Sequence, residues 1–264
     1  MKIGFIGTGN MGTAIIGGIL KKGIANASDI IGSSPDEALR KKAADEFGIE
    51  TTADNLEVLK KADIVFFSVK PQIIPVVVDE IKDSIREDQL FISIVAGKSM
   101  SWYENAFGRK IKLIRTMPNT PALVGEGMTA AVIGELVSED EKNTALEILG
   151  SFGQVEVVSE HLMDAVVAVS GSSPAYIFML IEAMADGAVA EGMPRVQAYK
   201  FASQAVLGSA KMALELGKHP GELKDMVCSP AGTTIEAVRV LENMGFRAAV
   251  IEAEKACAEI NRNL

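Results

Sequence analysis

The residues Gly7-Thr8-Gly9-Asn10-Met11-Gly12 have the glycine spacing of a loop that binds phosphate groups. The apolar run 2–6 precedes them, and apolar positions at helical spacing follow. In such a unit the first glycine permits a tight turn, the second lets a pyrophosphate approach the backbone, and the third lets the helix contact the strand. Free N–H groups at the start of the helix then face the phosphates. We therefore expect a dinucleotide cofactor to contact Ile6, Gly7, Thr8, Gly9, Asn10, Met11 and Gly12.

The end of the second predicted strand, residues 29–32, bears on the choice between NAD and NADP. An Asp or Glu at this point would hold the ribose 2′-hydroxyl, but the chain has Ser33 and Ser34 instead. Small hydroxyl side chains leave room for a 2′-phosphate and can donate hydrogen bonds to it, and Arg40 or Lys41 could add a positive charge. The sequence therefore favours NADPH, with NADH as a possible second cofactor. Replacing Ser33 by Asp is expected to shift the preference toward NADH.

Two more loops follow strongly apolar strands. The first strand covers residues 64–69 and the second covers residues 90–95. In open α/β sheets, ligands bind at the carboxyl ends of parallel strands. We therefore expect the cofactor to contact Ser68, Val69, Lys70 and Pro71 in the first loop, and Val95, Ala96 and Gly97 in the second.

These loops require a sheet to position them, and the first 160 residues have the pattern of one. The predicted strands are 2–6, 29–32, 64–69, 90–95, 113–115, 128–133 and 155–158, with helices such as 36–47 and 138–152 between them. Strands and helices in alternation predict a mostly parallel, doubly wound Rossmann sheet. After about residue 160 only helical patterns remain, at about 161–191, 195–216, 220–227, 233–243 and 245–262. We therefore expect a dinucleotide-binding domain over residues 1–160 and an all-α domain over residues 161–264.

The composition narrows the class of protein. The chain of 264 residues has a formal net charge of −9, which argues against a nucleic-acid partner because phosphate backbones are held by Lys and Arg. Its two cysteines, Cys228 and Cys257, form no CxxC pair, so we expect no disulfide and a cytoplasmic location. We expect no signal peptide, no metal site, and no membrane span, because serines, Gly171, Pro174 and acidic residues interrupt the longest apolar region.

The sequence resembles the pyrroline-5-carboxylate reductase family along nearly its whole length. Its most specific motif is Ser229-Pro230-Ala231-Gly232-Thr233-Thr234, in which many relatives have two glycines where this chain has Ala231-Gly232. The other matching segments are residues 5–12, 69–71, 115–121 and 170–176. The resemblance implies reduction of L-1-pyrroline-5-carboxylate to L-proline by NADPH or NADH, the last step of proline biosynthesis. It also implies a homodimer through the helical domain, often assembled as a pentamer of dimers, a decamer.

The resemblance also implies roles for particular residues. Thr234 is the catalytic candidate, with its hydroxyl on the ring nitrogen of the substrate. The substrate carboxylate is expected at the helix start formed by Gly232 and Thr233. The remaining implied positions are Ser229, which shapes the loop, Glu160 near the substrate ring, Asn119 near the nicotinamide, and Asn55 among the cofactor contacts.

The residues offer no convincing general acid. The two histidines, His161 and His219, have no recognisable carboxylate or nucleophile partner in the sequence. The substrate is therefore expected to react as a protonated iminium ion or to take a proton from water. A hydroxyl is a poor acid, so Thr234 would orient the ring, and its alternative role is to cap a helix.

Two other functions remain as alternatives. A β-hydroxyacid dehydrogenase shares this domain layout but carries a catalytic Lys on the helix after the domain junction, and residues 165–194 contain neither Lys nor Arg. A non-catalytic NADP-binding protein could also have this fold. The threonine loop together with the complete glycine motif favours the reductase.

Overall fold

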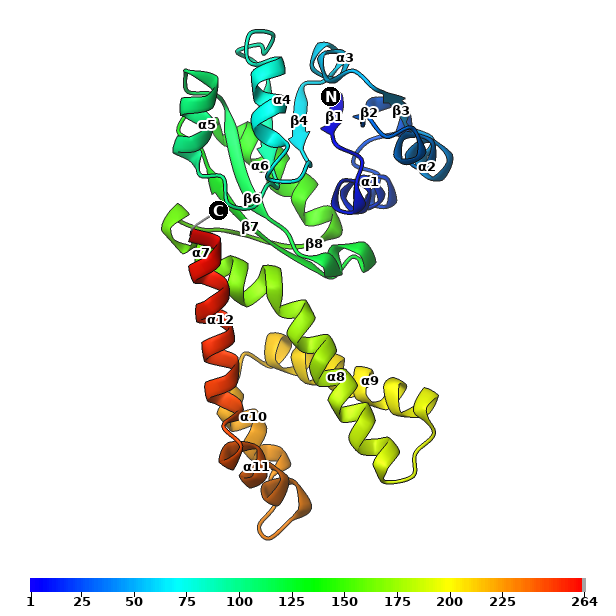
Figure 1. The fold of residues 1–264 in the computed structure, drawn as a ribbon, viewed down its shortest axis with the longest axis vertical. Helices are drawn as coiled ribbons and strands as arrows, with labels where there is room; N and C mark the ends of the chain where they lie inside the picture. Colours follow the sequence, from blue (N-terminus) through cyan, green and yellow to red (C-terminus); the bar gives the residue numbers. More distant parts are fainter. Residues whose placement is uncertain (263–264) are drawn as a thin grey trace. The chain divides into compact units, whose positions relative to one another are not determined.

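The structure is a computed structural model that describes residues 1–262, and it divides into two compact units (Figure 1). The first unit comprises Met1–Ser172 and the described residues from Cys257 onward, and the second comprises Ser173–Ala256. The first unit thus extends beyond the change of pattern near residue 160 and takes in the end of the last helix. Each unit is described by itself below.

The first unit contains one eight-stranded sheet with the strand order β3-β2-β1-β4-β5-β6-β7-β8. All neighbouring strands are parallel except β6 and β7. The order reverses at β1, which pairs with β2 on one side and β4 on the other, and ligands bind at such switch points. The predicted fold class is confirmed. The strands are β1 (Ile3–Ile6), β2 (Ile30–Ser33), β3 (Glu50–Thr52), β4 (Ile64–Phe67), β5 (Leu90–Ser93), β6 (Leu113–Met117), β7 (Gly127–Ile133) and β8 (Gly153–Val157).

Helices cover both faces of this sheet, and successive strand residues, which point to opposite faces, enter two different cores. On one face Phe66 stacks on Phe5 with ring centroids 4.7 Å apart, in the core cluster that includes residues of α1 and α6. On the other face Phe67 stacks on Phe91 at 5.3 Å, among residues of α3, α4 and α5. The helices are α1 (Asn10–Lys22), α2 (Glu37–Phe47), α3 (Asn55–Lys61), α4 (Ile74–Ile81), α5 (Met100–Phe107) and α6 (Glu139–Leu149).

Two segments differ from the sequence-based expectation. The short edge strand β3 was not predicted, because it is only three residues long and partly exposed. The segment Val167–Ser172 forms a π-helical turn after α7 (Met163–Val166), which was not predicted, and it lies within the helical run Glu160–Ala190, which was predicted at about residues 161–191. Within the described part of the chain, this run alone is long and apolar enough to cross a membrane by length and composition. One such helix is weak evidence for a membrane span.

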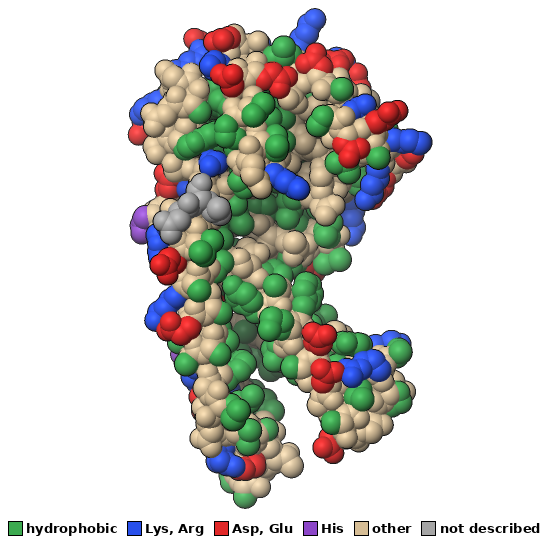
Figure 2. Space-filling view, in the orientation of Figure 1, with side chains coloured by type: hydrophobic (Ala, Val, Ile, Leu, Met, Phe, Trp, Pro, Cys, Tyr) green, Lys and Arg blue, Asp and Glu red, His purple; other side chains and the backbone are tan. Residues whose placement is uncertain are grey.

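The second unit is helical, as predicted, and exposes much of its apolar surface. Its helices are α8 (Ser173–Ala190), α9 (Arg195–Leu216), α10 (Pro220–Val227), α11 (Thr233–Asn243) and the greater part of α12 (Phe246–Arg262). In its described residues only the small side chains Ala185, Ala198 and Ala202 are buried among the hydrophobic ones. Phe178 and Met179 are 65% and 68% exposed, and Figure 2 shows many hydrophobic side chains on the surface of these helices. A surface this apolar is typical of an interface with another chain.

Candidate active site

The glycine loop after β1 has a separate geometric reason for each glycine. Gly7 has a φ of +104°, and a Cβ there would lie 2.5 Å from the Ser68 carbonyl oxygen. A Cβ on Gly12 would lie 2.7 Å from the Gly7 carbonyl oxygen. A Cβ on Gly9 would meet nothing within 4 Å. The first and third glycines are therefore needed by the fold, whereas Gly9 borders open space that a phosphate can enter.

The N-terminus of α1 is available to an anion. Gly9 is its N-cap residue, no side chain caps the helix, and its first turn contains no acidic residue. The first N–H groups of a helix lack intrahelical acceptors and favour negative charge. Thr8 contributes no side chain to this surface, because it is 1% exposed and its methyl group faces Gly32. Asn10 is exposed, and Met11 packs against the core.

The two serines at the end of β2, which the sequence analysis treats together, have different hydrogen-bond partners in the structure. Ser33 is buried, and its hydroxyl donates to Asn55 Oδ1 at 2.6 Å, while Asn55 Nδ2 donates to Glu80 at 2.8 Å. Ser34 is also buried, and its hydroxyl oxygen accepts from the Asp36 N–H at 3.2 Å. A carboxylate introduced at position 33 would therefore first meet Asn55.

The two candidate cations near this end of β2 have different surroundings. Arg40 Nη1 donates to the carbonyl oxygens of Ser34 and Pro35, at 2.6 and 3.0 Å. Lys41 instead pairs with Asp45 along α2 at 2.6 Å. Arg40 is therefore the cation that borders the end of β2.

The loop after β4 is tied directly to the glycine loop. Ser68 N–H donates to the Ile6 carbonyl at 2.9 Å, and its hydroxyl donates to the Gly7 carbonyl at 2.6 Å. Val69 packs against the same turn, since a Cβ on Gly7 would lie 3.0 Å from Val69 Cγ1. Lys70 is exposed beside the half-buried Pro71. The structure thus brings the first two predicted cofactor loops together.

The loops after β5 and β6 are held by polar side chains. Val95 is buried and its N–H donates to Ser93 Oγ at 3.2 Å, while Ala96 and Gly97 are half-buried. Asn119 Oδ1 accepts from the Met128 N–H at 2.9 Å, and its Nδ2 donates to the Ser170 carbonyl at 3.2 Å. Asn119 therefore joins the start of β7 to the π-helical turn.

Glu160 has a charged partner that sequence reasoning missed. Its Oε1 accepts from Arg115 Nη1 at 2.8 Å and from the Met100 N–H at 2.7 Å. The available signal was an arginine within the apolar strand Leu113–Met117, but the local sequence does not identify the residue that would pair with it.

The segment 229–234 of the second unit forms a compact turn. The Gly232 N–H donates to the Ser229 carbonyl at 3.0 Å, with Pro230 and Ala231 between them. Ala231 has a φ of +57°, and within the described chain it is the one non-glycine residue with positive φ. Proline followed by a positive φ matches a type II turn, which favours glycine at the position of Ala231. A Cβ on Gly232 would collide with Ser229 Oγ, so a side chain at this position would displace the Ser229 hydroxyl.

The threonines after this turn begin α11 without capping it. The N-cap residue is Gly232, and no side chain caps the helix. The Thr234 side chain makes no hydrogen bond within the described residues, and the residue is half-exposed. The hydroxyl and the first N–H groups of α11 are thus both available to a ligand, and the capping alternative for Thr234 has no support.

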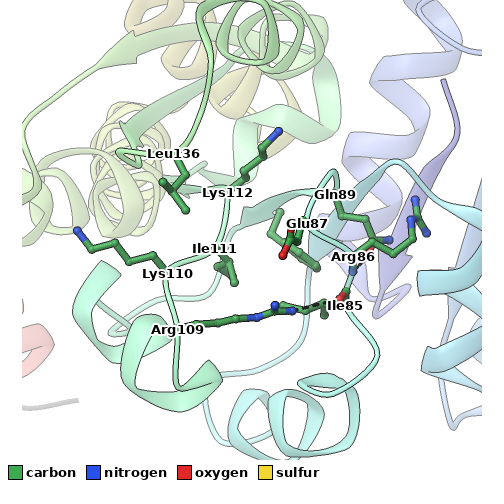
Figure 3. Close-up of a pocket in the computed structure, with 10 residues that line it drawn as sticks. Ile85, Arg86, Glu87, Gln89, Arg109, Lys110, Ile111, Lys112 and Leu136 are labelled. Atoms are coloured by element: carbon green, nitrogen blue, oxygen red, sulfur yellow. Dashed lines mark hydrogen bonds between the residues drawn. The ribbon is translucent and has the colours of Figure 1, made fainter.

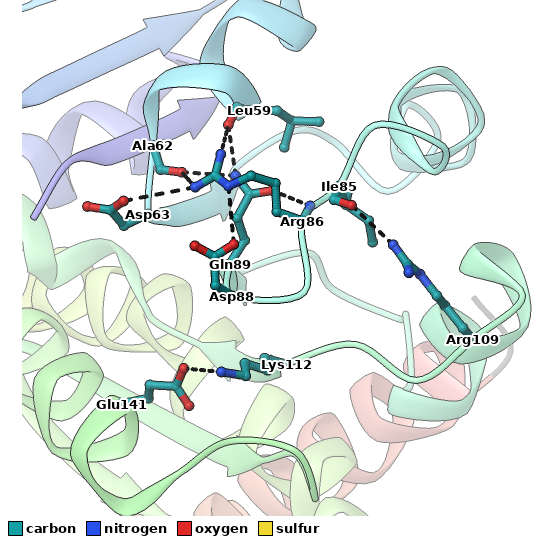
Figure 4. A network of polar contacts seen from close by, with 10 residues as sticks. All are labelled: Leu59, Ala62, Asp63, Ile85, Arg86, Asp88, Gln89, Arg109, Lys112 and Glu141. Carbon is teal, nitrogen blue, oxygen red and sulfur yellow. Dashed lines mark hydrogen bonds and ion pairs between the residues drawn. The ribbon is translucent and has the colours of Figure 1, made fainter.

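One cavity away from these loops lies at the opposite ends of the strands. It measures about 330 Å³ near the amino ends of β5 and β6 (Figure 3), and it is lined by Ile85, Arg86, Glu87, Gln89, Phe91, Arg109, Lys110, Ile111, Lys112 and Leu136. Arg86 donates to the carbonyls of Leu59 and Ala62, and Lys112 pairs with Glu141 at 2.6 Å (Figure 4). Through these contacts, Arg86 and Lys112 stabilise the fold. No group of three or more potential metal-ligating residues occurs in the described chain.

Two family profiles match the chain, one in each half. Residues 160–264 match pyrroline-5-carboxylate reductase dimerisation, and residues 2–97 match NADP oxidoreductase coenzyme F420-dependent. Among similar proteins, the pyrroline-5-carboxylate reductase of Escherichia coli (strain K12) is 54% identical over 100% of this chain and 98% of its own length. That of Methanosarcina acetivorans is 45% identical over 100% of this chain and 97% of its own length.

Solved structures give the same result. The pyrroline-5-carboxylate reductase of Coxiella burnetii has a TM-score of 0.91 and 35% identity, covering 99% of this chain and 97% of that one. The Plasmodium falciparum pyrroline carboxylate reductase, solved with NADP bound, has a TM-score of 0.91 and 30% identity over 100% of this chain and 97% of its own. A 3-hydroxyisobutyrate dehydrogenase, at 14% identity and a TM-score of 0.54, shares the fold alone.

Proposed function

The chain belongs to the pyrroline-5-carboxylate reductase family, and from this premise we propose which of its residues reduce L-1-pyrroline-5-carboxylate to L-proline. The enzyme is an NAD(P)H-dependent oxidoreductase. The observation that carries the assignment of the reaction to particular residues is the pairing of a complete glycine loop with a free threonine at an uncapped helix start.

The cofactor residues fit a dinucleotide. Gly9 borders open space and α1 has no side-chain cap, so backbone N–H groups can bind the pyrophosphate. We assign the 2′-phosphate of NADPH to the end of β2 near Arg40, and the nicotinamide to the loops that contain Val95 and Asn119. When bound, NAD(P)H supplies the hydride, and the protein supplies position and electrostatics.

The substrate is a cyclic imine that carries a carboxylate. We assign the carboxylate to the first N–H groups of α11, which have no side-chain cap and no intrahelical acceptor. The Thr234 hydroxyl then lies within one helical turn and can bond the ring nitrogen. Because a hydroxyl is a poor acid, the ring reacts as an iminium ion protonated by water, and Thr234 orients it.

The assembly proposal rests on the exposed apolar surface of the second unit. The dimerisation profile supports self-association, and we propose a homodimer through the helical residues, with five dimers forming a decamer. Residues 1–160 would then bind the cofactor and residues 161–264 the substrate and the partner subunit. We also propose a cytoplasmic location, because its two cysteines are free and a reducing compartment keeps cysteines in that form.

The direct test follows NADPH oxidation at 340 nm with L-1-pyrroline-5-carboxylate as the substrate. The reductase assignment predicts rapid NADPH oxidation with this imine, and no reduction of NADP⁺ to NADPH with 3-hydroxyisobutyrate. Turnover of the hydroxyacid alone would support the dehydrogenase alternative. Cofactor binding without turnover of either compound would support a non-catalytic protein.

A further inference from the structure

The end of β2 has no acidic residue of its own, but the structure brings one close to it from another element. In a Rossmann domain a carboxylate at this strand end accepts the ribose 2′-hydroxyl of NAD. Here the last residue of the strand is Ser33, whose hydroxyl donates to Asn55 Oδ1 at 2.6 Å. Asn55 Nδ2 in turn donates to Glu80 Oε2 on α4 at 2.8 Å. A carboxylate therefore lies two hydrogen bonds from the end of β2, and all three residues belong to the first unit.

The chemistry of the three groups fixes the direction of these hydrogen bonds. A carboxylate accepts hydrogen bonds and does not donate them, so the amide nitrogen of Asn55 must face Glu80 and its amide oxygen must face Ser33. The Ser33 hydroxyl has one proton, which Asn55 Oδ1 accepts, and its other contact is also an acceptor, the Phe5 carbonyl at 3.4 Å. Ser33 thus has no proton left for a ligand, whereas a phosphate group is bound by donors.

The charge of Glu80 is not compensated within the described chain. The residue is exposed and forms no ion pair with any side chain of residues 1–262. The nearby start of α3 offers an anion little, because its N-cap residue is acidic: the Asp54 carboxylate accepts from the Leu56 N–H at 2.8 Å. The N-terminus of α1, by contrast, has neither a side-chain cap nor an acidic residue in its first turn. The surroundings of Asn55 are therefore negative, in contrast to the helix start assigned to the pyrophosphate.

We propose that Glu80 is a specificity-determining residue for the cofactor. Its carboxylate, held by Asn55 close to the end of β2, favours the 2′-hydroxyl of NADH and opposes the 2′-phosphate of NADPH. The inference rests on the proposed function, which puts the adenosine ribose at this strand end. Arg40 on α2 acts in the opposite sense, since its guanidinium is held at the same strand end by the Ser34 and Pro35 carbonyls. One negative and one positive side chain thus set the balance between the two cofactors.

The test uses Glu80→Gln, which removes the charge and keeps the shape of the side chain. The dissociation constants of NADPH and NADH are measured by fluorescence titration without substrate. The ratio of the constant for NADH to that for NADPH is expected to rise by about fivefold, the effect of one exposed charge. This ratio cancels any change that affects both dinucleotides equally. The ratio of kcat/KM for NADPH to that for NADH, with pyrroline-5-carboxylate as substrate, should rise by a similar factor.

The matched control is Asp79→Asn, which removes the same charge from the preceding residue of α4. Asp79 is exposed and pairs with Lys82 at 2.6 Å, so its substitution should change the ratio of dissociation constants by less than about twofold. An unchanged ratio in a folded Glu80→Gln protein would overturn the proposal. An equal rise in Asp79→Asn would do the same, since it would indicate an effect of net charge alone.

A second variant, Glu80→Lys, separates the effect of charge from a structural role. If the charge acts on the 2′-phosphate, the ratio rises from the parent to Glu80→Gln and rises further in Glu80→Lys, with little change in Tm because the side chain is exposed. Equal ratios in the two variants would contradict the proposal. A parent protein that binds both dinucleotides but does not oxidise them with pyrroline-5-carboxylate would contradict the proposed reaction instead, while the binding ratios would still decide the role of Glu80.

Discussion

Thr234 is the residue on which the catalytic proposal most depends. Because Gly232 is the N-cap residue of α11 and carries no side chain, Thr234→Ala removes no cap. We predict that this variant lowers kcat/KM for pyrroline-5-carboxylate by about 10-fold or more with little change in Tm. Steady-state kinetics and thermal denaturation measure the two effects.

The control for Thr234 is Ser138→Ala, because the Ser138 side chain caps α6 by accepting from the Glu141 N–H. It should show the opposite pattern, with about 1 kcal/mol of stability lost and kinetics unchanged. A Thr234→Ala enzyme with normal kinetics and a lowered Tm would contradict the assignment.

Arg40 gives a prediction about cofactor choice. Its guanidinium is held at the end of β2 by the Ser34 and Pro35 carbonyls, whereas Lys41 pairs with Asp45. Arg40→Gln is therefore expected to lower the ratio of kcat/KM for NADPH to that for NADH by about 10-fold, as for loss of one charge-assisted contact to the 2′-phosphate. Lys41→Gln should leave the ratio unchanged, and equal effects of both substitutions would contradict the assignment of the 2′-phosphate to Arg40.

Some site residues could be predicted from the sequence and others could not. The glycine loop was predictable because its function depends on backbone freedom, which residue type reports directly. Ser33 was correctly placed at a strand end, but its burial against Asn55 depends on a residue more distant in the chain. The ion pair between Arg115 and Glu160 was missed because no local sequence pattern connects the two residues.

At the scale of elements, the N-terminus of α1 contains one glycine that the fold requires and one that we assign to cofactor binding. A Cβ at Gly9 meets open space, whereas a Cβ at Gly12 collides with the Gly7 carbonyl. Gly9→Ala should therefore keep its Tm and weaken NADPH binding by about 10-fold or more, because the methyl group occupies the path of the pyrophosphate. Gly12→Ala should lower both Tm and affinity. Fluorescence titration and thermal denaturation distinguish these outcomes, and unchanged NADPH binding in Gly9→Ala would place the phosphates elsewhere.

Elements were predicted correctly where the hydrophobic pattern extends over many residues, and they were missed where the patterned segment is short. The helices α9, α10 and α11 begin and end at the predicted residues, since proline or glycine stands near their ends. The strand β3 is too short to show a period. The helical run at about 161–191 was predicted, but its π-helical turn at Val167–Ser172 was not, because the local sequence does not distinguish such a turn from the α-helix around it.

At the scale of the whole molecule, the apolar surface of the helical unit requires a partner. Phe178 on α8 is 65% exposed, although it would contribute about 1.5–3 kcal/mol if buried. We predict that Phe178→Asp converts the dimer or larger assembly to a monomer at micromolar concentration, as measured by light scattering. The control is Val76→Asp on α4, which is 68% exposed in the first unit and should leave the mass unchanged. An unaltered assembly in Phe178→Asp would place the interface elsewhere.

The helical unit is inserted between two segments of the chain that both belong to the first unit. The chain leaves the first unit at Ser172 and returns at Cys257, and these two side chains lie 3.1 Å apart. Asn261 then donates to Asp164 at 2.7 Å and fastens the returning end. The helical unit is therefore an insertion whose flanking residues lie side by side. After a proteolytic nick within it, both fragments still contain residues that belong to the first unit. We therefore expect that the helical unit, with the turn that carries Thr234, can be replaced by that of a relative without a change in the strand register of the sheet.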